Sequence, residues 1–191
     1  MVEDTRSLAT VVQIMDEGAV GRTVTRMAAE IVENDGGDVM LVGIHTRGVP
    51  LADRLAGELE GIFGKKPSVG RLDITLYRDD IGPWRPAHTQ PVLKKTVLPI
   101  SIDDKVIYLV DDVLYTGRTV RAALDTLIDY GRPRAIRLAV LVDRGHRELP
   151  VAADVVGKVV ATSRREDVQV RLRPADDRDG VWLGREAPDG S

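Results

Sequence analysis

The residues best suited to chemistry lie close together in residues 106–119. Two adjacent carboxylates, Asp111 and Asp112, precede the sequence Thr-Gly-Arg-Thr at residues 116–119. Paired carboxylates can accept hydrogen bonds from a vicinal diol, or hold Mg²⁺ directly or through water. Threonine hydroxyls, and backbone N–H groups beside a glycine, can bind a phosphate. Phosphate, diol and metal together indicate a ribose 5-phosphate derivative as the ligand.

A strand and a helix are expected to position these groups. Residues 106–110 (Val-Ile-Tyr-Leu-Val) are typical of a strand buried on both faces of a parallel sheet. After the turn, apolar residues follow helical spacing, and Gly131 with Pro133 is expected to end that helix. Ligands of open α/β sheets bind at the carboxyl ends of strands, where a helix start also attracts anions. The alternative is that the two acids only cap the helix.

A second candidate anion site follows another buried strand. Residues 39–44 are apolar, and Thr46 and Arg47 come next, ahead of a helical segment at 51–60. An arginine in this place can donate several hydrogen bonds to a pyrophosphate. When this segment is considered alone, an ordinary turn with a surface arginine explains it equally well.

The rest of the chain alternates strands and helices, which predicts an α/β fold with a mostly parallel central sheet. A first helix is expected at about 17–33, with Asp16 as its N-cap. Further strands are expected at 9–14, 71–78, 135–142, 155–162 and 168–172. Residues 79–96 lack periodicity and are expected to form a long flexible loop. Residues 174–191 are acidic with few apolar anchors, which predicts a mobile tail after a single domain at 1–173.

The composition narrows the class of protein. The 191 residues are enough for one full core, the formal net charge is −3, and cysteine is absent. No global basic bias indicates nucleic acid, although a local basic patch is compatible with these numbers. No apolar run approaches the length of a membrane span, and no signal peptide is evident. A cytoplasmic protein that binds neither DNA nor membranes is therefore expected.

Several motifs carry a resemblance to a known family. The paired acids and the Thr-rich turn resemble the 5-phosphoribosyl-1-pyrophosphate (PRPP) motif of type I phosphoribosyltransferases. Residues 73–80 (Asp-Ile-Thr-Leu-Tyr-Arg-Asp-Asp) and 143–150 (Asp-Arg-Gly-His-Arg-Glu-Leu-Pro), with 110–127 and 157–158, narrow the resemblance to the bifunctional PyrR family. The chain is identified as a member over roughly residues 9–172. Proteins of this family are pyrimidine operon attenuators with uracil phosphoribosyltransferase activity.

The resemblance implies a type I phosphoribosyltransferase fold, in which helices flank the sheet and a small hood lies at about 144–172. It implies conversion of uracil and PRPP to UMP and pyrophosphate. Mg²⁺ would be held by Asp111 and Asp112, mainly through water and PRPP, and these two residues with Arg47 would be catalytic. In such enzymes the pyrophosphate loop often contains a cis non-proline peptide. The expected substrate-binding residues are Thr46, Arg47, Arg78, Asp111, Asp112, Val113, Leu114, Tyr115, Thr116, Gly117, Arg118, Thr119, Arg144 and Val168.

The resemblance also implies a regulatory role. In the family a basic surface binds pyrimidine operon leader mRNA when UMP or UTP is bound. The matching positions here are Thr25, Arg26, Arg147 and Lys158. Ala29 and Ala152 replace a histidine and an arginine that are common in the family, which removes two polar contacts to RNA. A homodimer or a larger homo-oligomer is expected.

Two alternative functions remain compatible with the sequence. One is a UMP/UTP-sensing RNA-binding regulator with weak or vestigial catalysis. Another is a phosphoribosyltransferase that uses a purine or orotate, which residues 143–150 argue against. An NAD-type oxidoreductase is not supported, because no Gly-x-Gly-x-x-Gly motif follows a strand.

Overall fold

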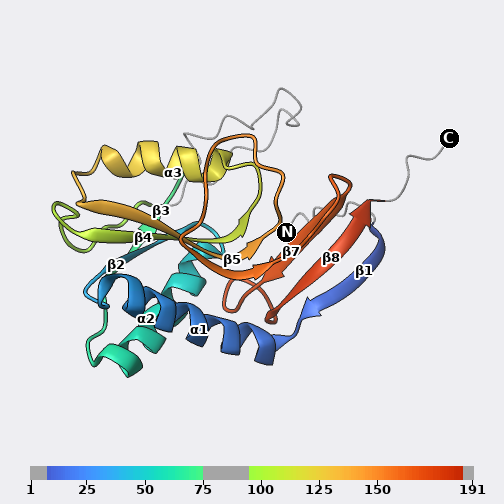
Figure 1. The fold of residues 1–191 in the computed structure, drawn as a ribbon, viewed down its shortest axis with the longest axis horizontal. Helices are drawn as coiled ribbons and strands as arrows, with labels where there is room; N and C mark the ends of the chain where they lie inside the picture. Colours follow the sequence, from blue (N-terminus) through green and yellow to red (C-terminus); the bar gives the residue numbers. More distant parts are fainter. Residues whose placement is uncertain (1–7, 75–94, 187–191) are drawn as a thin grey trace.

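The fold is α/β, with two separate sheets, and it was obtained as a computed structural model that describes residues 8–74 and 95–186 (Figure 1). Along the chain the elements are β1 (Leu8–Met15), α1 (Glu17–Asp35), β2 (Met40–Ile44), α2 (Gly48–Phe63), β3 (Val69–Leu72), β4 (Val106–Leu114), α3 (Arg118–Ile128), β5 (Ala135–Asp143), β6 (Val155–Val159), β7 (Glu166–Arg171) and β8 (Gly180–Glu186). The expected alternation of strands and helices is confirmed. The expected long loop at 79–96 falls mostly outside the described residues.

The larger sheet has five parallel strands in the order β3-β2-β4-β5-β6. Helices α1 and α2 cover one face and α3 covers the other (Figure 1). The central strand β4 contributes side chains to both faces of the sheet, because successive side chains point to opposite faces. Tyr108 and Val110 pack with α1 and α2, whereas Ile107 and Leu109 pack with α3. The apolar run at 106–110 is therefore buried on both sides, as its composition predicts.

The smaller sheet is antiparallel, in the order β1-β8-β7. Its buried residues Val168, Val170 and Val181 belong to the same apolar cluster as the buried face of α1. The smaller sheet is therefore joined to the main core. The hood expected at about 144–172 also includes the two chain ends, because β1 and β8 supply two of its three strands.

The prediction of a mobile tail from residue 174 is wrong for the described part of that segment. Strand β8 is the middle strand of the smaller sheet and pairs with both neighbours. Val181 is completely buried, and Trp182 lies beneath the guanidinium groups of Arg171 and Arg178. The acidic composition of the segment did not predict this strand, because the apolar residues that anchor it are few and its partner strands come from distant parts of the chain.

Several element boundaries also differ from expectation. Strand β4 continues to Leu114, because Asp111 still pairs with Val140 of β5. The two acids therefore lie within the strand, not after it. Helix α3 ends at Ile128, before Gly131, and helix α2 begins at Gly48, three residues earlier than predicted. Within the described residues, no helix combines the length and apolar character needed to cross a membrane.

Candidate active site

The candidate site lies where two neighbouring strands of the larger sheet end. Strands β2 and β4 run parallel and adjacent, with Gly43 paired to Val110. The loop after β2 therefore comes beside the acids of β4. The contact is close, since a Cβ added to Gly48 would collide with the carbonyl oxygen of Val110. Only glycine permits this approach of α2 to β4.

The paired acids of β4 are partly shielded from water. Asp111 is 7% exposed, and its Oδ1 accepts a hydrogen bond of 3.0 Å from the Asp112 backbone N–H. Burial raises the pKa of the Asp112 carboxyl, against the opposing effects of Asp111 and of the positive charge on Arg47. Proximity of Arg47 to Asp112 joins the two predicted anion sites into one region.

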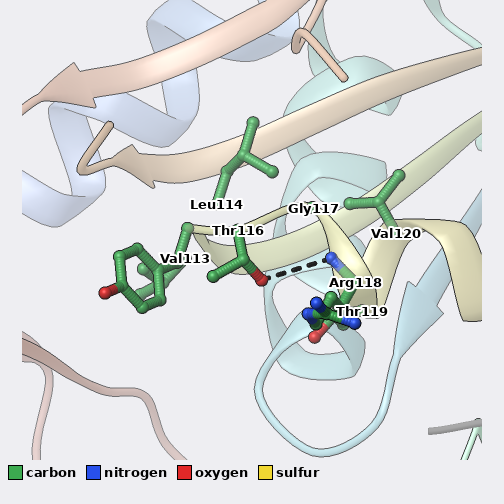
Figure 2. A pocket seen from close by; sticks show the side chains of 8 residues that line it. Val113, Leu114, Thr116, Gly117, Arg118, Thr119 and Val120 are labelled. Atoms are coloured by element: carbon green, nitrogen blue, oxygen red, sulfur yellow. Dashed lines mark hydrogen bonds between the residues drawn. The ribbon is translucent and has the colours of Figure 1, made fainter. Parts of the chain in front are cut away.

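The turn after β4 encloses a pocket of about 140 Å³ lined by residues 113–120 (Figure 2). Gly117 forms the turn with φ of 92°, in the left-handed region that favours glycine. Helix α3 starts at the next residue, and no side chain caps its first turn. Its leading N–H groups, with the Thr116 hydroxyl, therefore form a cradle for an anion. The Thr116 hydroxyl accepts a hydrogen bond of 3.4 Å from the Arg118 N–H (Figure 2).

Residues 143–151, here called the support segment, hold this turn in place. The Glu148 and Leu149 backbone N–H groups donate to the Thr116 carbonyl, at 2.9 and 3.1 Å. Arg118 forms an ion pair of 2.9 Å with the Glu148 side chain. The motif on which the resemblance to the PyrR family rests thus also supports the turn at residues 115–117, here called the phosphate turn after its predicted ligand.

Arg147, which the resemblance predicts to contact RNA, also contributes to this support. Its guanidinium donates to the Asp143 carboxylate, to the Tyr115 carbonyl at 2.9 Å, and to the Val151 carbonyl at 3.1 Å. Its side chain is only 22% exposed. An RNA contact by Arg147 would have to compete with these bonds.

Arg144 and Val168 bring the smaller sheet to the phosphate turn. The Arg144 guanidinium lies over the Tyr115 ring, 4.1 Å from its centroid, and pairs with Asp167 of β7 at 3.2 Å. Its side chain is 6% exposed, and its Nε is buried without a partner in the described structure. The Val168 side chain lies in the core at 7% exposure, so only its backbone can face a ligand.

The loop after β2 carries the second anion site. The His45–Thr46 peptide is cis, as the resemblance leads one to expect for the pyrophosphate loop. Arg47 precedes α2 and forms a two-pronged ion pair with Asp176. Its hydrogen bonds to Asp176 raise the pKa of Arg47, so the guanidinium stays charged at all working pH values. Arg78, which was expected to reach the same anion, lies outside the described residues.

The expected RNA-binding residues lie elsewhere, along α1 and β6. Thr25, Arg26 and Lys158 are exposed. Arg26 donates hydrogen bonds to the carbonyl groups of Val156, at 2.9 Å, and Gly157. The structure thus brings the amino-terminal helix and the strand after the support segment together, as a shared surface requires.

Asp176 is the site residue that sequence reasoning missed. It was assigned to the mobile tail, whereas its carboxylate lies at the candidate site. The signal that could have found it is the apolar alternation of Val181 and Leu183, which predicts a strand and makes residues 172–179 a tight connection.

Comparisons with known proteins show the family of this chain. The phosphoribosyl transferase domain model matches residues 10–171. The bifunctional protein PyrR of Clostridioides difficile is 55% identical over 173 residues, covering 90% of this chain and 96% of that protein. The bifunctional protein PyrR of Pelotomaculum thermopropionicum is 57% identical over 173 residues, covering 90% and 94%. The solved hypoxanthine phosphoribosyltransferase of Trypanosoma cruzi has a TM-score of 0.67 at 14% identity, covering 92% and 97%, which shows the fold alone.

The fold and the site together define a type I phosphoribosyltransferase. Within that class, the chain belongs to the bifunctional PyrR family. It is accordingly a uracil phosphoribosyltransferase with the family's role in regulating pyrimidine genes. The reading as a regulator with vestigial catalysis is not favoured.

Proposed function

We propose that this site carries out the Mg²⁺-dependent reaction of uracil with PRPP, which gives UMP and pyrophosphate. One observation supports it above the others. The acid pair of β4, the phosphate turn before α3 and the arginine loop before α2 meet at the carboxyl edge of adjacent strands. Their chemistry matches the three parts of PRPP: a diol, a 5-phosphate and a pyrophosphate.

Each group has a defined task in the proposed reaction. Asp111 and Asp112 accept hydrogen bonds from the ribose hydroxyls. Residues 113–119 surround the 5-phosphate, which receives N–H donors from the start of α3. Thr46 and Arg47, with Arg78, bind the pyrophosphate. Uracil lies between Arg144 and the Val168 backbone.

The two carboxylates would supply part of the coordination shell of Mg²⁺, and PRPP would supply further oxygen ligands. Carboxylate oxygens are ligands that Mg²⁺ favours, and Asp111 and Asp112 supply them. The described residues contain no group of three or more metal-ligating side chains. The remaining ligands would then be water and substrate oxygens. When bound, the metal supplies positive charge to the departing pyrophosphate.

The protein contributes position and charge, without a covalent nucleophile. The phosphate turn and the acid pair hold the ribose at both ends, which fixes the anomeric carbon relative to uracil. Arg47 stabilises the negative charge that develops on the pyrophosphate as the bond breaks. The support segment keeps the phosphate turn rigid through the Thr116 carbonyl.

The regulatory role is proposed to use Arg147 together with the surface of Thr25, Arg26 and Lys158. Two cations and a hydroxyl are exposed there, on α1 and β6, away from the phosphate turn. The partner is pyrimidine leader mRNA, bound when UMP or UTP occupies the active site. A cytoplasmic homodimer or larger homo-oligomer completes the proposal.

The test is release of pyrophosphate from PRPP with each of uracil, hypoxanthine, guanine and orotate, with and without Mg²⁺. Turnover that requires uracil and Mg²⁺ is expected. Binding of UMP without any turnover would instead support the purely regulatory alternative. Preferential use of hypoxanthine would overturn the assignment of the base.

A further inference from the structure

An ion pair that spans the chain lies at the candidate active site. The Asp176 carboxylate accepts from Arg47 at both oxygens, with Nε–Oδ2 of 2.8 Å and Nη2–Oδ1 of 2.9 Å. Arg47 belongs to the loop after β2, and Asp176 to the connection between β7 and β8. Two parallel charge-assisted bonds fix the plane of the guanidinium as well as its position.

The carboxylate itself is held by its own backbone turn. Asp176 Oδ2 also accepts from the Leu172 N–H at 2.8 Å, and the Asp176 N–H donates to the Leu172 carbonyl at 2.9 Å. Leu172 is completely buried in the main core. Asp176 is 15% exposed, so its carboxylate is a fixed and partly shielded acceptor and not a mobile surface acid.

In the part of the chain that the structure describes, no backbone turn of its own holds the Arg47 side chain in this way. It is 39% exposed and precedes α2 in a loop. A free arginine side chain samples many rotamers, and ordering it has an entropic cost. A guanidinium carries five N–H groups, and the pair with Asp176 uses two of them. The same side chain can therefore be held by Asp176 and still donate to an anion.

We infer that Asp176 is a positioning residue for the phosphoribosyl transfer, which orients the Arg47 guanidinium toward the departing pyrophosphate. This inference rests on the proposed role of Arg47 at that pyrophosphate. It also gives the connection between β7 and β8 a direct part in the reaction. Loss of Asp176 weakens the use of PRPP and leaves the uracil contacts in place.

The connection offers a matched control in Asp179. Asp179 pairs with Arg54 at 2.7 Å and accepts from the Arg173 N–H at 2.8 Å. It anchors the same connection to α2 through Arg54, whereas Asp176 pairs with Arg47 in the loop before α2. Asp179→Asn therefore measures the effect of a loosened connection between β7 and β8 when the pair of Asp176 with Arg47 is kept.

The experiment compares Asp176→Asn and Asp179→Asn in the full chain. For Asp176→Asn we expect kcat/KM for PRPP to fall by roughly 10-fold to 100-fold, with KM for uracil unchanged. Asp179→Asn should change kcat/KM for PRPP less than about twofold, even if it lowers the melting temperature equally. Equal losses of kcat/KM in the two variants, or an unchanged Asp176→Asn, would overturn the inference.

A double-mutant cycle with Arg47→Ala shows whether Asp176 acts through Arg47. In the Arg47→Ala background, Asp176→Asn should have no further effect on kcat/KM for PRPP. Additive losses would contradict a positioning role. If wild-type protein shows no turnover, the proposed function fails first. Calorimetric binding of Mg²⁺-pyrophosphate to the same four proteins then still decides whether Asp176 and Arg47 are coupled.

Discussion

The acids at the candidate active site lie in different electrostatic environments, which shift their pKa values in opposite directions. Asp176 faces a guanidinium, and although burial opposes it, hydrogen bonding to Arg47 keeps the pKa of Asp176 below its ordinary value. Asp112 lies next to another acid, and burial raises its pKa. A shielded carboxylate with a raised pKa is costly to ionise, and a site built this way favours a ligand that brings hydroxyl donors or a cation.

The first prediction concerns that acid pair. Asp111→Asn or Asp112→Asn keeps the side-chain size but removes the charge that a ribose hydroxyl and Mg²⁺ would contact. We expect kcat/KM to fall about 100-fold, equivalent to roughly 3 kcal/mol of transition-state stabilisation. The melting temperature should stay the same or rise, because a buried charge is removed. Steady-state kinetics with uracil and PRPP, together with thermal unfolding, measure both quantities.

Asp125→Asn provides the control for a lost carboxylate. Asp125 is exposed on α3 and pairs only loosely with Arg121, at 3.7 Å. A surface pair of this kind contributes little, so activity and stability should both remain close to wild type. Unchanged kinetics in the two β4 variants would show that the acids are not at the ribose.

At the scale of elements, close backbone packing between α2 and β4 sets the distance between the two halves of the site. Gly48→Ala would place a methyl group against the Val110 carbonyl. We expect a loss of roughly 1–3 kcal/mol in the free energy of unfolding, because neither backbone can yield easily. The displaced loop should also raise KM for PRPP. Urea unfolding and initial-rate kinetics measure these effects.

Helix α2 also contains a matched control for Gly48→Ala. A Cβ added to Gly57 meets nothing within 4 Å. Since alanine favours a helix more than glycine does, Gly57→Ala should be neutral or stabilise by up to ~1 kcal/mol. Equal destabilisation by the two alanines would mean that Gly48 matters for helix propensity and not for close packing.

Helix α1 and strand β6 together carry the prediction for RNA. Arg26→Ala removes one exposed cation and its bonds to the Val156 and Gly157 carbonyls. We expect weaker binding of pyrimidine leader RNA in the presence of UMP, with the salt slope reduced by about one unit. Uracil turnover should remain, because Arg26 donates to β6, which β5 separates from β4 and its acid pair. Filter-binding titrations at several salt concentrations measure the slope.

Arg121→Ala is the paired control, since Arg121 also faces an acid four residues later on a helix. It lies on α3, across the sheet from α1 (Figure 1). RNA affinity should not change in this variant. Parallel losses of RNA binding and turnover in Arg26→Ala would indicate a folding defect and not a lost contact.

At the scale of the whole molecule, the ion pairs of partly buried acids predict how stability responds to acid. Burial pushes the pKa of Asp143 and Asp176 upward, but hydrogen bonds from Arg147 and Arg47 outweigh it. The hydrogen bond from Arg54 likewise lowers the pKa of Asp179. All three pKa values therefore lie below the ordinary value of 3.8.

The sign of the stability change follows from these directions. A depressed pKa means that folding favours the ionised acid, so its contribution is fully present above pH 3.8 and is lost as pH falls through the lower folded value. We expect the free energy of unfolding to decrease below about pH 4 in urea titrations. Asp112 opposes this trend, since its raised pKa makes its contribution shrink as pH rises from 3.8. The stability gap between wild type and Asp176→Asn should narrow in acid, and a constant gap would contradict the ion pair.

Local sequence pattern determined the main elements and the centre of the site. The apolar run of β4, the adjacent acids and the glycine turn before α3 are contiguous, so spacing alone placed diol, metal and phosphate chemistry at a strand end. Periodicity also identified α1, including its N-cap Asp16, which accepts from the Ala19 N–H at 2.7 Å. The error in where β4 ends arose because pairing with β5 extends the strand through the acids.

Only the tertiary structure decided which charged side chains lie at the site and which form hydrogen bonds or ion pairs with distant parts of the chain. The motif predicts Arg147 as an RNA contact, and the structure adds that its guanidinium donates to the Leu114 and Tyr115 carbonyl groups, some thirty residues earlier in the chain. Asp176 looked like part of a mobile acidic tail, whereas its partner lies 129 residues away. Periodicity reports how a segment folds against its nearest neighbours. It carries no information on ion pairs between distant segments, because these form only when the sheets bring their ends together.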